Sequence, residues 1–218
     1  MDPSDIRRYF VSYTNMLKIV EYRGCEVSKD YFLDYSSFMA KYGGLEDGNI
    51  LKEKISGLIF ENATSKIIVE WYNDKRIGIG IRDVVVKMEA NNVKNALVVA
   101  DNGINAGCKD MIKNIKATKH IIIDVWTLKE SMVFVPDHVL VPKHRICSKQ
   151  ENMVIYKAYG IKTKALPGGL LKADMLPHIK TDDVMVKYLG ATKGQLIEIT
   201  RPSDTNPKLD IITYRLVV

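Results

Sequence analysis

The chain has 218 residues, enough for one large or two modest domains, and its 46% hydrophobic and 27% charged residues are typical of a folded globular protein rather than a disordered one. Its three scattered cysteines form no C-x-x-C pair, and the odd count argues against a disulfide framework. The N-terminus lacks the apolar core of a secretory signal, and no apolar run approaches the length that spans a bilayer, so we expect a soluble intracellular protein.

The net charge of +6 is unevenly distributed along the chain. Residues 1–137 contain 19 Lys and Arg against 19 Asp and Glu, whereas residues 138–218 contain 13 against 7. A basic half of a chain suggests a polyanion or an acidic protein surface as its partner, although lysines also serve as solvated surface.

The N-terminal residues predict two helices. Ser4 or Asp5 can cap the first, whose apolar residues recur at spacings of three and four until Gly24. Ser28 opens the second, and a Gly-Gly pair at 43–44 stops it. Each helix would bury one apolar stripe.

The next stretch predicts an alternation of strands and helices. After a polar, Gly-containing segment at 45–54 that we expect to be a loop, the predicted strands are 67–72, 77–81, 96–100 and 120–126, and the predicted helices are 83–92 and 105–118. Such alternation implies right-handed crossovers and neighbouring parallel strands. Residues 1–134 are therefore predicted to form an α/β domain with a mostly parallel sheet.

Pro136 and Pro142 bracket a β-branched run, and a helix cannot continue through either proline. We predict a strand here, and a hinge over residues 135–147. Beyond it, Ser148 and Glu151 form a capping box for a helix that ends near residue 159.

The remaining residues predict a small α+β domain over 148–218. Thr181 or Asp182 can cap a short helix that Gly190 ends. Two β-rich runs, 195–200 and 210–218, are joined by a Pro/Asp/Asn loop and should form an antiparallel pair.

Motifs for catalysis are weak. The pair Gly78-x-Gly80 lies where a dinucleotide-binding turn would lie, but Asp83 replaces the third glycine, so a flat strand end is favoured. The adjacent carboxylates Asp182 and Asp183 are better explained as a helix cap. No lysine follows an acidic residue by two positions, a pattern of many metal-dependent nucleases, so we predict that the chain alone does not make or break phosphodiesters.

His138, His144 and Cys147 could be interpreted as metal ligands. Their spacing matches no zinc pattern, and packing or hydrogen bonding at a domain joint is the favoured interpretation. We therefore predict no metal and no cofactor.

A basic helix is the more informative feature. Lys109, Lys113 and Lys116 recur at spacings of four and three, which places their ammonium groups on one helical face, and Asn105 can cap the helix next to a phosphate. On the residues alone, a solvated helix face is favoured over a phosphate-binding one.

Five runs in the last third of the chain carry a resemblance to a known family. They are 138–144 (HVLVPKH), 186–190 (VKYLG), 193–195 (KGQ), 199–204 (ITRPSD) and 212–217 (ITYRLV). In this order they resemble the fifth subunit of eukaryotic RNA polymerases and its counterpart in archaeal polymerase. The N-terminal half is similar to the eukaryotic jaw domain in layout only.

The chain departs from the family at two places. Asn105-Ala106 replaces the Thr-Pro step that precedes a helix near downstream DNA in the family. The family has one Leu-Pro step between the helices of its assembly domain, whereas this chain has two, at 166–167 and 176–177, with an insertion whose role stays open. This divergence makes a viral member plausible.

The resemblance implies a non-catalytic structural subunit of a multisubunit DNA-directed RNA polymerase, present in one copy per complex, with a jaw domain over 1–134 and an assembly domain over 148–218. The implied contacts with the largest subunit are His138, Pro142, His144, Arg201, Tyr214 and Arg215. The implied contacts of the jaw with downstream duplex DNA are Asn105, Lys109, Lys113 and Lys116. A cellular protein would be nuclear, and a viral one would lie in the host cytoplasm or the virion. The alternative is a free-standing basic nucleic-acid-binding protein.

Overall fold

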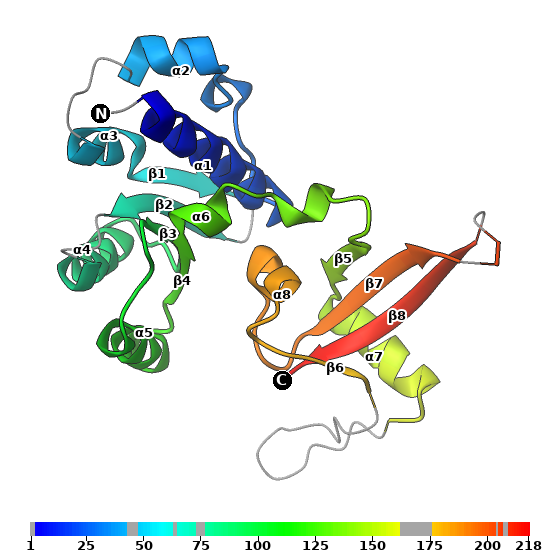
Figure 1. The fold of residues 1–218 in the computed structure, drawn as a ribbon. Helices are drawn as coiled ribbons and strands as arrows, with labels where there is room; N and C mark the ends of the chain where they lie inside the picture. The colour runs from blue at the N-terminus through cyan, green and yellow to red at the C-terminus, as the bar shows by residue number, and fades with distance from the viewer. Residues whose placement is uncertain are drawn as a thin grey trace. The chain divides into compact units, whose positions relative to one another are not determined.

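The computed structural model describes residues 3–42, 48–62, 65–72, 77–161, 176–203, 205–206 and 209–218. The chain divides into two compact units, Met1–Phe134 and Val135–Val218 (Figure 1). No helix in these described ranges is long and apolar enough to cross a membrane. Each unit has a four-stranded sheet of its own.

The N-terminal unit is built on a sheet with the strand order β1-β2-β3-β4. β1 (Leu58–Glu61) pairs antiparallel with β2 (Lys66–Tyr72), while β3 (Asn95–Ala100) and β4 (Ile122–Thr127) continue the sheet in parallel. The predicted parallel neighbours and three of the predicted strands are confirmed. The antiparallel edge strand β1 was not predicted.

Two crossover helices, α4 (Ile77–Ala90) and α5 (Ala106–Lys119), pack on one face of this sheet (Figure 1). The predicted strand at 77–81 is wrong, because these residues form the start of α4. Ile81 continues the buried helical face of the residues after it, and a Cβ on Gly80 would lie 2.5 Å from a ring carbon of Tyr72. The glycine at position 80 therefore permits a close helix-to-strand approach rather than marking a strand end.

The opposite face of the sheet is covered by α1 (Pro3–Tyr22), which also contacts the short helix α6 (Leu128–Ser131). A buried polar network joins these elements. The indole Nε1 of Trp71 on β2 donates to Oγ of Ser12 at 3.1 Å, and the Ser131 hydroxyl donates to the same oxygen at 2.7 Å. Buried polar groups that bond one another in this way fix how α1 lies on the sheet.

The start of the chain differs from the prediction in its caps and breaks. α1 begins at Pro3, so Ser4 and Asp5 lie inside its first turn rather than before it. The helix predicted from Ser28 is split into a 3-10 helix (Lys29–Tyr31) and α2 (Tyr35–Tyr42). The split occurs because the Asp34 carboxylate accepts from the Ser37 N–H at 2.7 Å and starts a new helix.

The loop predicted at 45–54 is also wrong, because its second half belongs to α3 (Gly48–Ile55). Leu51 and Ile55, four residues apart, are fully buried, and α3 packs against β2. Residues 43–47 lie outside the described ranges.

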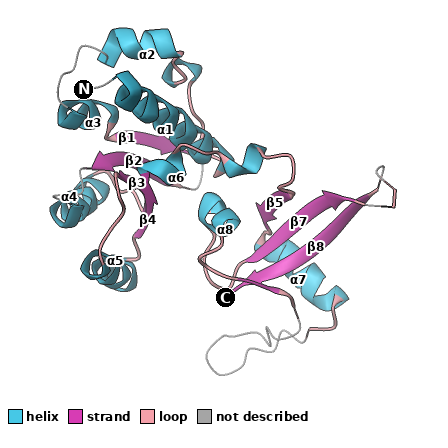
Figure 2. Cartoon of the chain, in the orientation of Figure 1, coloured by secondary structure: helices cyan, strands magenta, loops and turns pink. Residues whose placement is uncertain are grey.

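The C-terminal unit contains a sheet with the strand order β5-β7-β8-β6. β5 (Lys143–Ile146), β7 (Leu196–Pro202) and β8 (Asp210–Val217) are antiparallel neighbours, and β6 (His178–Ile179) pairs in parallel with the end of β8. Figure 2 shows the β7–β8 ribbon continuing past the ends of β5 and β6. The predicted antiparallel pair and the α/β plus α+β fold class are confirmed.

Two helices pack on the second sheet, and their caps were partly predicted. α7 (Lys149–Ala158) carries the predicted Ser148–Glu151 capping box. α8 (Val184–Leu189) ends at Gly190 as predicted, with φ +64°, but its cap is Asp183 rather than Thr181 or Asp182. The Asp183 carboxylate accepts from the Met185 N–H at 2.8 Å.

The strand predicted between the two prolines is misplaced. Val135–Asp137 form a 3-10 helix, a turn closed by the Val141 N–H and the His138 carbonyl follows, and β5 begins only after Pro142. The role of this segment as a hinge stays a prediction. The Leu166-Pro167 step lies outside the described residues.

Candidate protein and nucleic-acid interfaces

The C-terminal sheet has two faces that differ in their partners. Strand alternation places the odd-numbered residues of β7 and β8 on the side of α8, where Ile197, Ile199 and Val217 form one buried cluster. The even-numbered residues face α7, where Leu196 and Leu216 belong to a second cluster. Each side chain of the β7–β8 ribbon therefore points either to the α8 side or to the α7 side.

The α8 face carries a groove with a volume of about 490 Å³. It is lined by Leu140, Val141, Pro142, His144, Pro177, Ile179, Asp183, Met185, Ile199, Arg201, Thr213, Tyr214 and Arg215. Of the residues predicted to contact the largest subunit, all except His138 line this groove. The fold brings together residues from β5, β7 and β8 that are far apart in sequence.

Hydrogen bonds orient two of the groove residues. Nδ1 of His144 lies 2.7 Å from the carbonyl oxygen of Pro142, so its N–H donates there and fixes the ring plane. Arg215 donates to the carbonyl oxygen of His178 at 3.2 Å, which holds the guanidinium at the β6 end of the groove. Arg201 is exposed at the other end of the groove.

Tyr214 and His138 lie differently from the other predicted contacts. Tyr214 is an even-numbered residue of β8 that borders the groove, and its ring packs edge-on against Tyr159 on the α7 side, with centroids 6.3 Å apart. Partial burial raises the pKa of the Tyr214 phenol. His138 is exposed outside the groove lining, and its Nδ1 accepts from the Leu140 N–H at 3.2 Å.

The two faces also differ in how their arginines are paired. Arg145 on the α7 side forms a bidentate pair with Glu198, at 2.8 and 2.7 Å, and a third bond with Glu151 at 2.8 Å. Within the described ranges, no salt bridge reaches Arg201 or Arg215. Among the described residues, the groove therefore presents two guanidinium groups that form no salt bridge with a carboxylate.

Several groove residues were missed by the sequence patterns. Thr213, Ile179 and Met185 line the groove beside the predicted residues. Strand alternation from Arg215 could have indicated Thr213. Met185 on α8 and Ile179 on β6 reach the groove through tertiary packing, which no local sequence pattern predicts.

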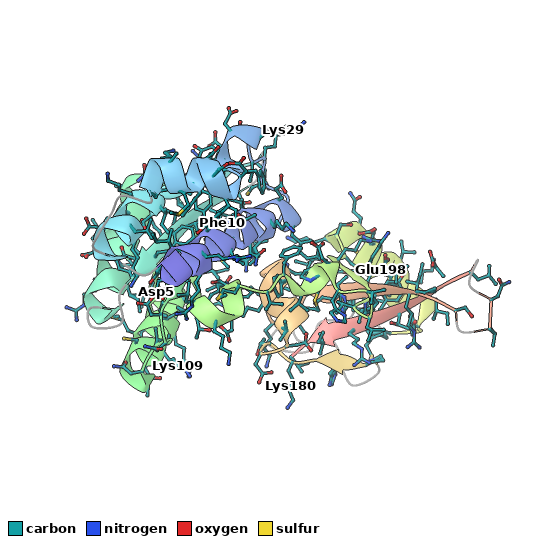
Figure 3. All side chains as sticks on the ribbon, turned by 45° about the horizontal axis from the view of Figure 1, so that its top comes forward. Asp5, Phe10, Lys29, Lys109, Lys180 and Glu198 are labelled. Atoms are coloured by element: carbon teal, nitrogen blue, oxygen red, sulfur yellow. The ribbon has the colours of Figure 1, made fainter. Side chains whose placement is uncertain are left out.

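The candidate DNA-binding helix has the predicted geometry. Asn105 caps α5, and its side-chain oxygen accepts from the Cys108 N–H at 2.9 Å. Lys109, Lys113 and Lys116 are all exposed, and Figure 3 labels Lys109 near the start of the helix. Nζ of Lys113 lies 3.8 Å from the Asp110 carboxylate, which partly neutralises the middle of this face.

The residues considered as metal ligands do not converge. His144 lines the groove, whereas Cys147 is buried in the cluster on the α7 side, where burial raises the pKa of its thiol. In the part of the chain that the structure describes, no group of three or more His, Cys, Asp or Glu residues could hold a metal ion.

Comparisons with known proteins cover most of the chain. A family model described as RNA polymerase Rpb5, C-terminal domain, matches residues 169–217. The chain is 29% identical over 209 residues to subunit RPABC1 of DNA-directed RNA polymerases I, II and III from Caenorhabditis elegans, covering 93% of this chain and 92% of that protein. The same subunit of Caenorhabditis briggsae is 30% identical over 159 residues, covering 72% of this chain and 69% of that protein. Subunit Rpo5 of the archaeon Archaeoglobus fulgidus is 40% identical over 82 residues, covering 38% of this chain and 92% of that protein. The chain therefore belongs to the Rpb5/RPABC1 family of DNA-directed RNA polymerase subunits.

Proposed function

We propose that this subunit is non-catalytic and docks on the largest subunit of its polymerase through the groove of the C-terminal unit. The observation that carries the proposal is the convergence of Pro142, His144, Arg201 and Arg215 on one groove. Its apolar floor, which includes Ile199 and Met185, offers area that a partner can bury.

The charges of the groove indicate what the partner presents. Arg201 and Arg215 lie on the same face as Ile199 and Thr213, and a guanidinium binds a carboxylate through two parallel hydrogen bonds. An acidic segment on the partner would complete both arginines. The excess of positive charge after residue 137 would then face protein rather than DNA.

Co-purification of the tagged subunit from its native source tests this docking. The double variant Arg201→Glu with Arg215→Glu is expected to lose at least about tenfold of the associated polymerase, because reversed charges would repel the partner's carboxylates. The matched control is Lys149→Glu with Lys157→Glu, which makes the same charge change at exposed positions of α7. Equal losses in the two variants would contradict docking through the groove.

For the N-terminal unit we propose a border with downstream duplex DNA along α5. Lysines on one helical face give a sequence-independent and salt-sensitive attraction to phosphates, and they position DNA without reading it. The Asn105 oxygen is already occupied by its cap, so a phosphate would meet the lysines and the remaining N–H groups of the first turn.

Family membership has consequences for the partners and the alternative. By homology the partners are other RNA polymerase subunits, and eukaryotic members of the family are nuclear. The relatives are named as polymerase subunits, not as free-standing nucleic-acid-binding proteins. The relatives described above are cellular proteins, so a viral origin stays a prediction.

A further inference from the structure

One long edge of the C-terminal sheet has no pairing strand among the described residues. β8 pairs with β7 along its whole length, but it pairs with β6 only at Leu216 and Val217. Across the described ranges, no strand pairs with the outer edge of β8 from Asp210 to Tyr214.

The backbone hydrogen bonds show which groups this edge presents. The Val217 N–H donates to the Gln195 carbonyl and the Ser203 N–H donates to the Leu209 carbonyl, so odd-numbered residues of this segment bond toward β7. The Leu216 N–H instead donates to the Pro177 carbonyl, on the β6 side. Because the direction alternates along an antiparallel strand, Asp210, Ile212 and Tyr214 direct their N–H and C=O groups to the open edge.

A proline explains where the pairing stops. In the parallel ladder, the next bond before that of Leu216 would run from the N–H of residue 177 to the carbonyl of Tyr214. Pro177 has no N–H, so this bond is missing, and the described ladder between β6 and β8 begins only at His178. Pro177, the residue directly before β6, thus accounts for where the described pairing begins.

The other edge of the β7–β8 ribbon, along β7, differs from the β8 edge. β5 covers β7 as far as Thr200, and the next residue that would face outward, Pro202, again lacks an N–H. Proteins commonly block sheet edges with proline or charge to prevent unwanted strand pairing. Between Asp210 and Arg215 the β8 edge carries neither proline nor charge, and Ile212 is 49% exposed there.

The groove supplies the chemistry of an occupant. A strand added beside β8 would place alternate side chains next to Ile211, Thr213 and Arg215, which belong to the groove face. Arg215 has five N–H donors and spends one on the His178 carbonyl. A carboxylate opposite Arg215 and an apolar side chain opposite Ile211, four residues along, would match this face.

We propose that an extended segment of a partner polymerase subunit adds to the open edge of β8 as a further strand, with an acidic residue opposite Arg215 and apolar residues beside Ile211 and Ile212. This inference rests on the docking proposed above, since the edge borders the same groove through Thr213 and Arg215. Backbone bonds along the edge would supply affinity, and the alternate side chains would supply specificity.

Hydrogen exchange at single-residue resolution tests the inference on the free subunit and on the assembled polymerase. In the free subunit the amides of Ile212 and Tyr214 should exchange rapidly, while those of Ile211 and Thr213 are protected by β7. Assembly should slow exchange at Ile212 and Tyr214 by at least about tenfold. Unchanged exchange in the complex would overturn the proposal, and so would full protection in the free subunit, which would mean that the chain covers its own edge.

A pair of variants at one position separates the backbone from the side chain. Ile212→Pro removes the outward N–H without removing a bond to β7, and Ile212→Ala keeps that N–H. The proline variant should bind the polymerase at least about tenfold more weakly than the alanine variant. Equal binding would refute strand addition. If the proline variant fails to fold, as judged by lost protection at Thr213, the exchange measurement on the natural sequence decides.

Different results would contradict the docking proposal and the strand-addition proposal. A natural-sequence subunit that does not co-purify with the polymerase contradicts docking itself. A subunit that does co-purify, depends on Arg201 and Arg215, and leaves Ile212 and Tyr214 unprotected contradicts strand addition alone.

Discussion

The two units differ in how they use their charged side chains. In the N-terminal unit, Lys87 reaches the buried Glu70 at 2.8 Å and Arg23 reaches Asp124 at 2.8 Å, so cations form ion pairs with acids inside the same unit. The groove of the C-terminal unit instead presents Arg201 and Arg215 beside an open strand edge. The C-terminal unit has an internal pair as well, between Arg145 and Glu198, but its groove also presents arginines that a partner can complete.

The largest change in the free energy of unfolding is expected from a substitution in the core of the N-terminal unit, and it tests the comparison of the two units. Leu97→Ala on β3 removes a fully buried side chain and should lower the free energy of unfolding of that unit by about 3 kcal/mol. Both tryptophans, Trp71 and Trp126, lie in this unit, so their fluorescence during denaturant unfolding reports it alone. The control Val86→Ala changes an exposed position of α4 and should cost less than about 0.5 kcal/mol.

The same variant also tests whether the units are separable. Protection of amides in β7 and β8 against exchange should be unchanged in Leu97→Ala, because the C-terminal unit has its own core clusters. Loss of protection there would break the comparison by showing that the units unfold together.

The second effect concerns the buried pair of the N-terminal unit. Glu70 is 1% exposed, and burial raises its pKa while the bond to Lys87 opposes that rise. Lys87→Met should therefore lower the free energy of unfolding by about 2 kcal/mol at neutral pH, since the carboxylate loses its charged partner. Lys94→Met, at an exposed position outside this pair, is the matched control.

The pH dependence of this variant has a definite sign. A carboxyl whose pKa is higher in the folded than in the unfolded state binds protons more readily when folded, so stability falls as pH rises from the unfolded pKa through the folded one. Removing Lys87 raises the folded pKa of Glu70 further, and the deficit of the variant should shrink when the pH is lowered from 8 toward about 5. An equal deficit at both pH values, measured by tryptophan fluorescence, would contradict this account.

The third effect belongs to the C-terminal unit. Ser148→Ala removes the side chain that accepts from the Glu151 N–H at 3.2 Å, and it should cost about 1 kcal/mol in the stability of that unit. Ser148→Gly should cost only a few tenths, because glycine tolerates the cap conformation. Amide exchange in α7 measures both, while tryptophan fluorescence should not change. A similar loss in the two variants would argue against the cap.

Local chemistry explains which parts of the fold were predictable. The capping box at Ser148, the Asn105 cap and the apolar run of β3 are determined by neighbouring residues, and the structure has all three. The Ile-Gly alternation at 77–81 resembles a strand, and only the approach to the Tyr72 ring shows why glycine occurs in a helix there. α3 was missed because its polar sequence is buried on one side by tertiary packing.

The candidate site was predictable to a similar degree. The family resemblance implied Arg201 and Arg215, and both line the groove. Adjacent residues of a strand point to opposite faces, so the ring of Tyr214 packs on the α7 side, away from the Arg215 side chain. The open edge of β8 could not be predicted, because it depends on which residues pair with Pro177. Register is a property of the folded sheet rather than of either strand alone.

The smallest effect on stability, and the last test of the comparison, concerns the α5 lysines. Lys109→Ala with Lys113→Ala should change the free energy of unfolding by less than about 0.5 kcal/mol, since both side chains are exposed. If these lysines contact phosphates, the assembled polymerase should retain downstream DNA less well, and the slope of log affinity against log salt should fall by about one to two. The lower figure applies if Asp110 already neutralises Lys113, 3.8 Å away. Lys94→Ala with Lys129→Ala is the matched control in the same unit. An unchanged slope would make the lysine face ordinary solvated surface, and the N-terminal unit would then lose its proposed contact with DNA while its internal ion pairs stay intact.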